Sequence, residues 1–68
     1  MTEFLSKIVE QYAEKFNIEK SDLYEVGLIG LRKAKNTYTQ DMGISLEEYT
    51  ERAIEGEIRR FCRYADKR

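Results

Sequence analysis

Few side chains in this sequence are suited to catalysis. Histidine is absent and Cys62 is the only cysteine, which excludes catalytic triads, histidine metal sites, an internal disulfide and a zinc site. Acidic pairs occur at Glu47–Glu48 and Glu55–Glu57, but both lie on expected helix surfaces without apolar shielding. Neither a phosphate-binding glycine loop nor an EF-hand spacing is present. The sequence therefore predicts a protein that is not an enzyme and that uses no metal or cofactor.

The thiol and a cluster of basic residues have structural explanations as well as functional ones. Cys62 follows Phe61 on a mostly apolar helix face, so we expect a buried thiol. Arg59, Arg60 and Arg63 form a small basic cluster that could hold phosphate. Basic residues at the end of a helix also complement the helix dipole. The cluster alone is compatible with both explanations.

Length and charge narrow the class of protein. The chain has 68 residues, of which 37% are charged and 41% hydrophobic, too apolar for a disordered chain and too polar for a membrane span. A net charge of −1 is unusual for a free-standing nucleic-acid binder, which is more often clearly basic. The first residues lack a signal-peptide pattern, and one free cysteine fits a reducing compartment. We expect a single domain over residues 1–68, cytoplasmic and without a membrane partner.

Three stretches have the apolar spacing of amphipathic helices, at residues 2–16, 22–36 and 46–65. Ser21 is the expected N-cap of the second helix, and Ser45 with Glu48 matches the capping box at the start of the third. We expect an all-α fold in which the first two helices pack antiparallel and the third lies across them. The expected core residues are Leu5, Ile8, Tyr12, Leu23, Leu31, Ala34, Leu46, Ala53, Ile58 and Phe61.

Two glycines in the second helix need an explanation. Gly27 and Gly30 lie in its interior, where each glycine costs about 1 kcal/mol relative to alanine. One explanation is the close packing of another helix of the same chain. The other is a surface that must admit the backbone of a partner. The residues themselves favour neither, and both can hold together.

A family resemblance begins at these glycines. Residues 22–31, Asp-Leu-Tyr-Glu-Val-Gly-Leu-Ile-Gly-Leu, resemble the Asp-Leu-x-Gln/Glu-x-Gly-x-x-Gly-Leu signature of region 2 of the sigma-70 family of bacterial RNA polymerase sigma factors. Further matches in the same register are Ala34, Tyr38, Gly43, Tyr49 and the run Ile54 to Phe61, which is similar to the family's Ile-Arg-Gly-Glu-Ile-Arg-Arg. The match runs without a gap from Asp22 to Arg63. It implies a three-helix, sigma region 2-like domain.

The resemblance implies a protein partner for the second helix. In the family, this helix docks on the clamp helices of the largest catalytic subunit of RNA polymerase. The residues that match the docking segment are Asp22, Glu25, Gly27, Leu28, Gly30 and Arg32. A coiled-coil partner that approaches closely would account for the interior glycines.

The resemblance also implies that the third helix binds the non-template strand of the promoter minus-ten element, where aromatic side chains stack on bases and basic side chains hold the backbone. The matching residues are Tyr49, Arg52, Arg59, Arg60 and Arg63. The sequence departs from the family at Glu47, Glu48 and Glu51, which flank the tyrosine, and at Arg52 and Ala53, where many members have aromatic or other DNA-contacting residues. Each exposed carboxylate would repel phosphate by roughly a few tenths to 1 kcal/mol.

Three functions follow from these observations. The first is a sigma module that binds core polymerase and promoter DNA, with a second sigma-like polypeptide supplying further DNA recognition. The second is an adaptor on the same fold that binds polymerase or an anti-sigma regulator but no longer melts DNA. The third is a helical dimer that buries the second helix around Leu28 and Ile29 in another copy.

Overall fold

The computed structural model describes residues 2–66, which form three α-helices and one short 3-10 helix and contain no strand. The elements are α1 (Thr2–Phe16), α2 (Lys20–Thr37), η1 (Gln40–Met42) and α3 (Leu46–Asp66). The predicted all-α class and the three helical segments are confirmed. Over the described residues, no helix combines the length and the apolar character needed to cross a membrane.

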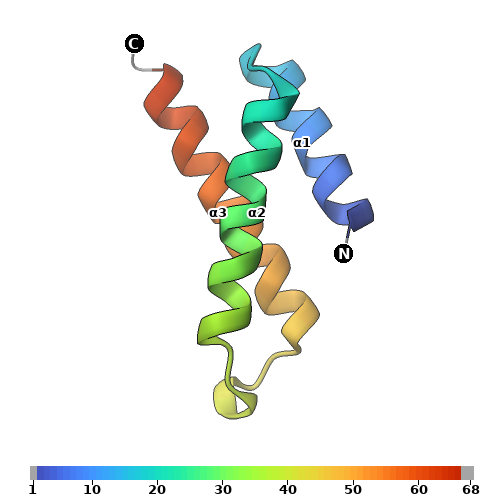
Figure 1. Ribbon diagram of the computed structural model, residues 1–68, viewed down its shortest axis with the longest axis vertical. Coiled ribbons are helices and arrows are strands. Elements are labelled where there is room, and N and C mark those ends of the chain that lie inside the picture. Colours follow the sequence, from blue (N-terminus) through green and yellow to red (C-terminus); the bar gives the residue numbers. More distant parts are fainter. Residues whose placement is uncertain (1, 67–68) are drawn as a thin grey trace.

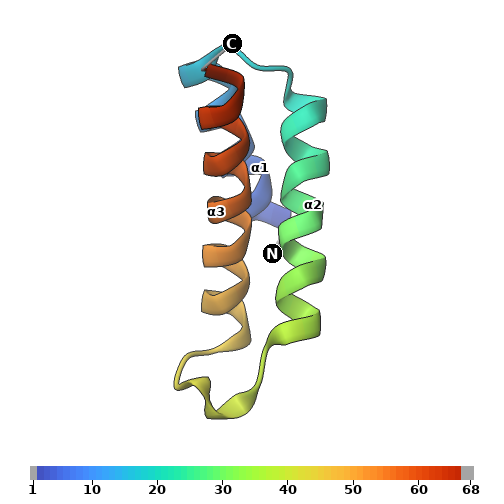
Figure 2. The ribbon, with the colours of Figure 1, turned by 90° about the vertical axis from the view of Figure 1, so that its left-hand side faces the viewer.

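The two long helices form the body of the fold. α2 and α3 are antiparallel and cross one another, and their contact is more extensive than either contact made by α1 (Figure 1). α1 packs beside the half of this pair that contains the start of α2 and the end of α3. Figure 2 shows α1 behind the two long helices. α1 and α2 run antiparallel and contact one another, as expected, but the larger contact is the one between α2 and α3 (Figure 1). α2 and α3, of 18 and 21 residues, share a longer contact than the 15-residue α1 can provide.

The core lies where the three helices meet. Val9, Leu23, Ile54, Ile58 and Cys62 are each at most 1% exposed. They come from all three helices, and partly buried aromatic residues surround them. α1 therefore closes the core at one end of the α2–α3 pair, where apolar side chains would otherwise face water.

The predicted core is mostly confirmed and wrong at one position. Leu5, Ile8, Leu23, Ala34 and Ile58 are buried, and Tyr12, Leu31, Ala53 and Phe61 are half-buried. Leu46 is 41% exposed. It is the first residue of α3, at the end of the α2–α3 pair that α1 does not cover.

A polar residue marks the true buried side of α3. Thr50, Ile54, Ile58 and Cys62 recur at four-residue intervals and are each at most 1% exposed. The Thr50 hydroxyl donates a hydrogen bond of 2.7 Å to the carbonyl oxygen of Leu46. This bond satisfies the hydroxyl inside the core, so burial of Thr50 carries little penalty. Because Thr50 is polar, the spacing of apolar residues alone does not identify it as a core position.

The two predicted helix starts have different outcomes. α2 begins at Lys20, so Ser21 lies inside the helix and its prediction as the N-cap is wrong. Glu19 occupies the cap position without a side-chain hydrogen bond. At α3, the backbone N–H of Glu48 donates to Ser45 Oγ at 3.1 Å, which confirms the serine half of the predicted capping box.

Two residues with positive φ shape the connections. Asn17 ends α1 at φ 56°, and the N–H of Ile18 donates to the carbonyl of Ala13 at 3.1 Å, a common way to end a helix. Gly43 follows η1 at φ 81°, a conformation that glycine adopts without steric cost. The Tyr38 hydroxyl donates a hydrogen bond of 2.8 Å to the carbonyl oxygen of Ile44, which holds the two ends of this second connection together.

Candidate protein-docking surface

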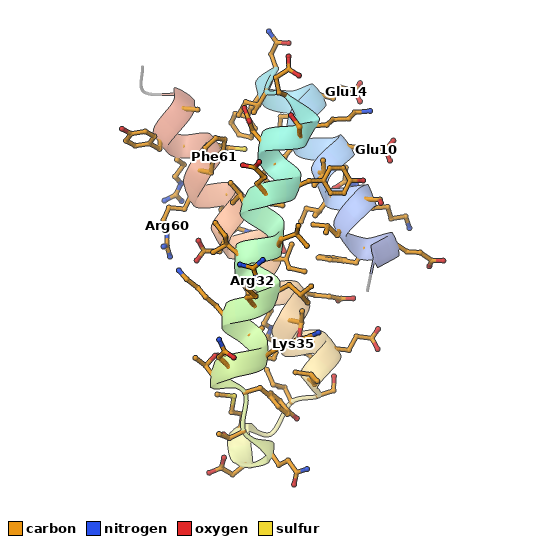
Figure 3. The ribbon with its side chains drawn as sticks, viewed as in Figure 1. Glu10, Glu14, Arg32, Lys35, Arg60 and Phe61 are labelled. Carbon is orange, nitrogen blue, oxygen red and sulfur yellow. The ribbon has the colours of Figure 1, made fainter. Side chains whose placement is uncertain are left out.

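Four of the predicted docking residues share the exposed side of α2. Asp22, Glu25, Leu28 and Arg32 form what we call the outward ridge; all four are exposed, and Leu28 retains 43% of its accessible surface. Their spacing of three, three and four residues keeps them on one side of a helix. Arg32 lies on the viewer's side of α2 in Figure 3. Among residues 2–66, none of the three charged ridge side chains forms an ion pair.

The two glycines of the predicted docking set point the other way. A Cβ atom on Gly27 would clash with Leu5 Cδ1 of α1. On Gly30 it would lie 2.9 Å from the carbonyl oxygen of Ala53 and from the Cα of Ile54, both in the backbone of α3. Gly27 and Gly30 are buried. Of the two explanations open at the sequence level, close packing within the chain is the one that this geometry supports, and the glycines are not part of the ridge.

The four predicted DNA-binding arginines lie on α3 and are all exposed; we call Arg52, Arg59, Arg60 and Arg63 the arginine face. Three of them are ion-paired within the helix, with Glu48, Glu55 and Glu57. Arg52 contacts Glu48 at 2.7 Å and Arg59 contacts Glu55 at 3.1 Å, both four residues apart. The carboxylates that the sequence places among these arginines therefore neutralise part of the positive charge locally.

The neighbours of the arginine face add further contacts. The pKa of Arg59 is raised above the ordinary arginine value by the nearby Tyr12 hydroxyl and by Glu55. Arg60 lies 3.7 Å from Glu57, a carboxylate that also accepts a 3.2 Å bond from Lys33 of α2. Arg60 therefore belongs to a charged group that links α2 and α3 across the surface.

Tyr49 is held against the end of α2. The Thr37 hydroxyl donates to the carbonyl of Lys33 at 2.8 Å, and it lies 2.8 Å from the Tyr49 hydroxyl. Because the single Thr37 proton is already used, the Tyr49 hydroxyl is the donor in this second bond. The rings of Tyr49 and Tyr38 lie 5.7 Å apart at an angle of 48°. The predicted base-stacking ring is thus half-buried, and one of its sides is occupied by Tyr38.

An acidic opening separates α1 from the start of α3. Glu3 and Glu10 of α1 and Glu47 and Glu51 of α3 line a cavity of about 590 Å³, together with Lys7. Over the described residues, no group of three His, Cys, Asp or Glu side chains has a metal-binding arrangement. The four carboxylates add negative potential close to the predicted DNA-binding residues, which disfavours phosphate there.

Cys62 is buried, as predicted. The side chain is 0% exposed, and its burial raises the pKa of the thiol. A buried thiol with a raised pKa carries less thiolate, which is the reactive form. The position is a core residue of α3.

A second surface is an apolar groove between α2 and α3; the sequence indicated an exposed face around Leu28 and Ile29 but not that Ile29 lies beside α3. Val26 and Ile29 of α2 and Phe61 and Tyr64 of α3 line a cavity of about 300 Å³, with Glu57 and Arg60 at its edge; we call these residues the α2–α3 groove. Ile29 is 46% and Tyr64 is 70% exposed. The sequence signal for this groove is the apolar stretch in the middle of α2. It has more apolar residues than the buried side of that helix can hold, so some of them face outward.

Comparison with known proteins adds no family: no family model matches the chain, and no solved structure is significantly similar to it. The likeness to sigma region 2 consequently depends on the residues from Asp22 to Arg63. In the structure these residues include an exposed ridge on α2 and a partly neutralised arginine face on α3.

Proposed function

We propose that the chain is a sigma-like module that docks on the clamp helices of the largest catalytic subunit of bacterial RNA polymerase. The outward ridge of α2 is the docking surface. One observation carries the proposal: in segment 22–31, which resembles the sigma signature, Asp22, Glu25 and Leu28 are exposed, and neither acidic side chain forms an ion pair among the described residues. A surface of this kind is suited to a helical partner with complementary charges.

The composition of the ridge indicates how docking is driven. Leu28 is 43% exposed at the centre of the ridge, so a partner that covers it gains part of the roughly 1.5–3 kcal/mol available from burying a leucine. Asp22 and Glu25 on one side and Arg32 on the other orient the partner, because charges at the edge of an interface mainly set approach and register. Leu28 is therefore the expected energetic centre.

A second contact, with single-stranded minus-ten DNA, is proposed through Tyr49 and the arginine face. Its support is the exposure of all four arginines on one helix. Each surface ion pair contributes only about 0.2–1 kcal/mol, so Arg52 and Arg59 can exchange their carboxylate partners for phosphate at small cost. The expected binding is weak and strongly dependent on salt.

The alternative function is an adaptor that docks in the same way but does not open the promoter. Two observations favour it: the glutamates that neutralise Arg52 and Arg59, and the packing of Tyr49 against Tyr38. In that case a second sigma-like polypeptide supplies DNA recognition, or the chain is itself the target of an anti-sigma regulator.

The docking proposal is tested by calorimetric titration of the chain with a recombinant clamp-helix fragment. Asp22→Arg is expected to weaken binding by at least about tenfold, because it reverses a charge on the ridge. Glu14→Arg makes the same change in charge on the exposed side of α1 and should leave the affinity unchanged. Circular dichroism confirms that both variants keep their helices. Equal affinity of the two variants would overturn the proposal.

The DNA contact is tested separately, by fluorescence anisotropy of a labelled minus-ten oligonucleotide at low salt. If the contact is made, Tyr49→Ala loses about 1–3 kcal/mol of affinity through lost stacking. Absence of binding by the unmodified chain, together with retained docking on the clamp fragment, would establish the adaptor instead.

A further inference from the structure

The α2–α3 groove is an apolar surface that no part of the described chain covers. Two of its residues, Phe61 and Arg60, lie on the side of the molecule away from α1 in Figure 3. Arg60 at its edge projects away from Glu10 and Glu14, which lie on the far side of the molecule in Figure 3. Ile29 and Tyr64 remain 46% and 70% exposed. Side chains of this size next to one another form a patch that another apolar surface can cover.

Charges of both signs lie beside the groove. On α2, Asp22 and Lys33 lie seven residues before and four residues after Ile29, on the same side of the helix. On α3, Glu57 and Arg60 lie at the edge of the groove. Because the two helices are antiparallel, the start of α2 with Asp22 lies at the same end of the pair as the basic end of α3. A surface with this pattern is complementary to a copy of itself.

We infer that the groove is the interface of a symmetric homodimer. A twofold axis parallel to the long helices places α2 of one copy over α3 of the other. The same end of the α2–α3 pair then lies at the same height in both copies. Gly27 lies against Ile58 and Gly30 against Ile54, so Asp22 is level with residues of α3 beyond Ile58. In the dimer Asp22 therefore faces Arg60 of the second copy, while Ile29 and Tyr64 meet their counterparts in the groove.

The size of the face sets the expected strength. The side that carries the groove extends 39 by 16 Å, so a copy covering all of it would bury at most on the order of 600 Å² per copy, at the lower end for stable interfaces. A net charge of −1 gives two copies little mutual repulsion. We therefore expect a reversible dimer that forms as the concentration rises. The inference does not depend on the proposed function, although both use Asp22; Ile29 lines the groove and is not part of the ridge, so it distinguishes the two.

Sedimentation equilibrium over a range of concentrations tests the interface. It compares two variants, each with a lysine in place of one of two neighbouring aliphatic residues of α2. Ile29→Lys places a charge in the groove and is expected to raise the dimer dissociation constant by at least about tenfold. Leu28→Lys is the matched control, since Leu28 is similarly exposed, at 43% against 46%, but belongs to the outward ridge. It should leave dimerisation within about twofold of the unmodified chain.

Charge reversal tests the orientation. Asp22→Lys and Arg60→Glu should each be monomeric alone, because each homodimer would bring like charges together twice. Mixed in equal amounts, the two variants should form a heterodimer with both opposite-charge contacts restored. A chain that stays monomeric at every concentration would overturn the inference. So would a dimer that loses affinity on Leu28→Lys but not on Ile29→Lys, or variants whose mixture remains monomeric.

Discussion

The outward ridge of α2 and the arginine face of α3 are both exposed and charged, but they differ in how their charges are used. On the ridge, Asp22, Glu25 and Arg32 form no ion pair within the described residues. On the arginine face, Arg52 and Arg59 are each paired with a glutamate four residues earlier. A side chain with no internal partner is available to another molecule, so the comparison favours the ridge as the binding surface. It also shows that a count of basic residues overstates the attraction of α3 for phosphate.

The largest expected effect is on the ridge itself. Leu28→Arg should weaken binding to the clamp-helix fragment by about 2–4 kcal/mol, because it puts a charge where an apolar centre is expected. Arg63→Leu on the arginine face should change that affinity by less than about 0.5 kcal/mol. Calorimetric titration measures both. Similar losses for the two variants would remove the distinction between the surfaces.

The next effect tests how the backbones of the two helices meet. Gly30→Ala should destabilise the fold by about 1–2 kcal/mol, since overpacking against the α3 backbone exceeds the gain of about 1 kcal/mol in helix propensity. Urea unfolding followed by circular dichroism measures the change. An unchanged or higher midpoint would show that α2 and α3 can separate at this point without cost.

A matched glycine lies on the open side of α3. A Cβ atom on Gly56 would meet no other atom within 4 Å, so Gly56→Ala should stabilise the fold by about 0.5–1 kcal/mol. The same unfolding experiment applies. A lower free energy of unfolding for Gly56→Ala would contradict this, because it would mean that the added methyl group meets neighbouring atoms.

The smallest effect concerns the charge pairing of α3. Replacing Glu48 and Glu55 together by glutamine frees Arg52 and Arg59, and should raise affinity for single-stranded DNA by about 0.5–1 kcal/mol at low salt. The control replaces Glu14 and Glu19, which makes the same change in net charge outside the acidic opening between α1 and α3. Anisotropy titrations measure the affinity for DNA. An equal increase in affinity for both double variants would show that only net charge matters.

Much of the fold follows from local sequence patterns. The three helices were predicted because apolar spacing is a property of each segment by itself. The error at Leu46 and the omission of Thr50 come from tertiary packing: α1 covers only one end of the α2–α3 pair, and a hydrogen bond allows a threonine to be buried. Neither fact is encoded in the periodicity of α3.

The candidate surfaces were predictable to a smaller extent. The resemblance singled out the residues of the ridge, but it could not separate the exposed Asp22 and Leu28 from the buried Gly27 and Gly30. That separation needs the positions of α1 and α3 around α2. The α2–α3 groove combines residues far apart in the sequence, such as Ile29 and Tyr64, so no single helical pattern reveals it.

The most direct test of the docking account is an NMR titration of the isotope-labelled chain with the clamp-helix fragment. The account predicts saturable shifts along the outward ridge, at Asp22, Glu25, Leu28 and Arg32, and little change at Glu14 on the far side of α1. A spectrum that does not change on addition of the fragment, or shifts confined to α1, would contradict it.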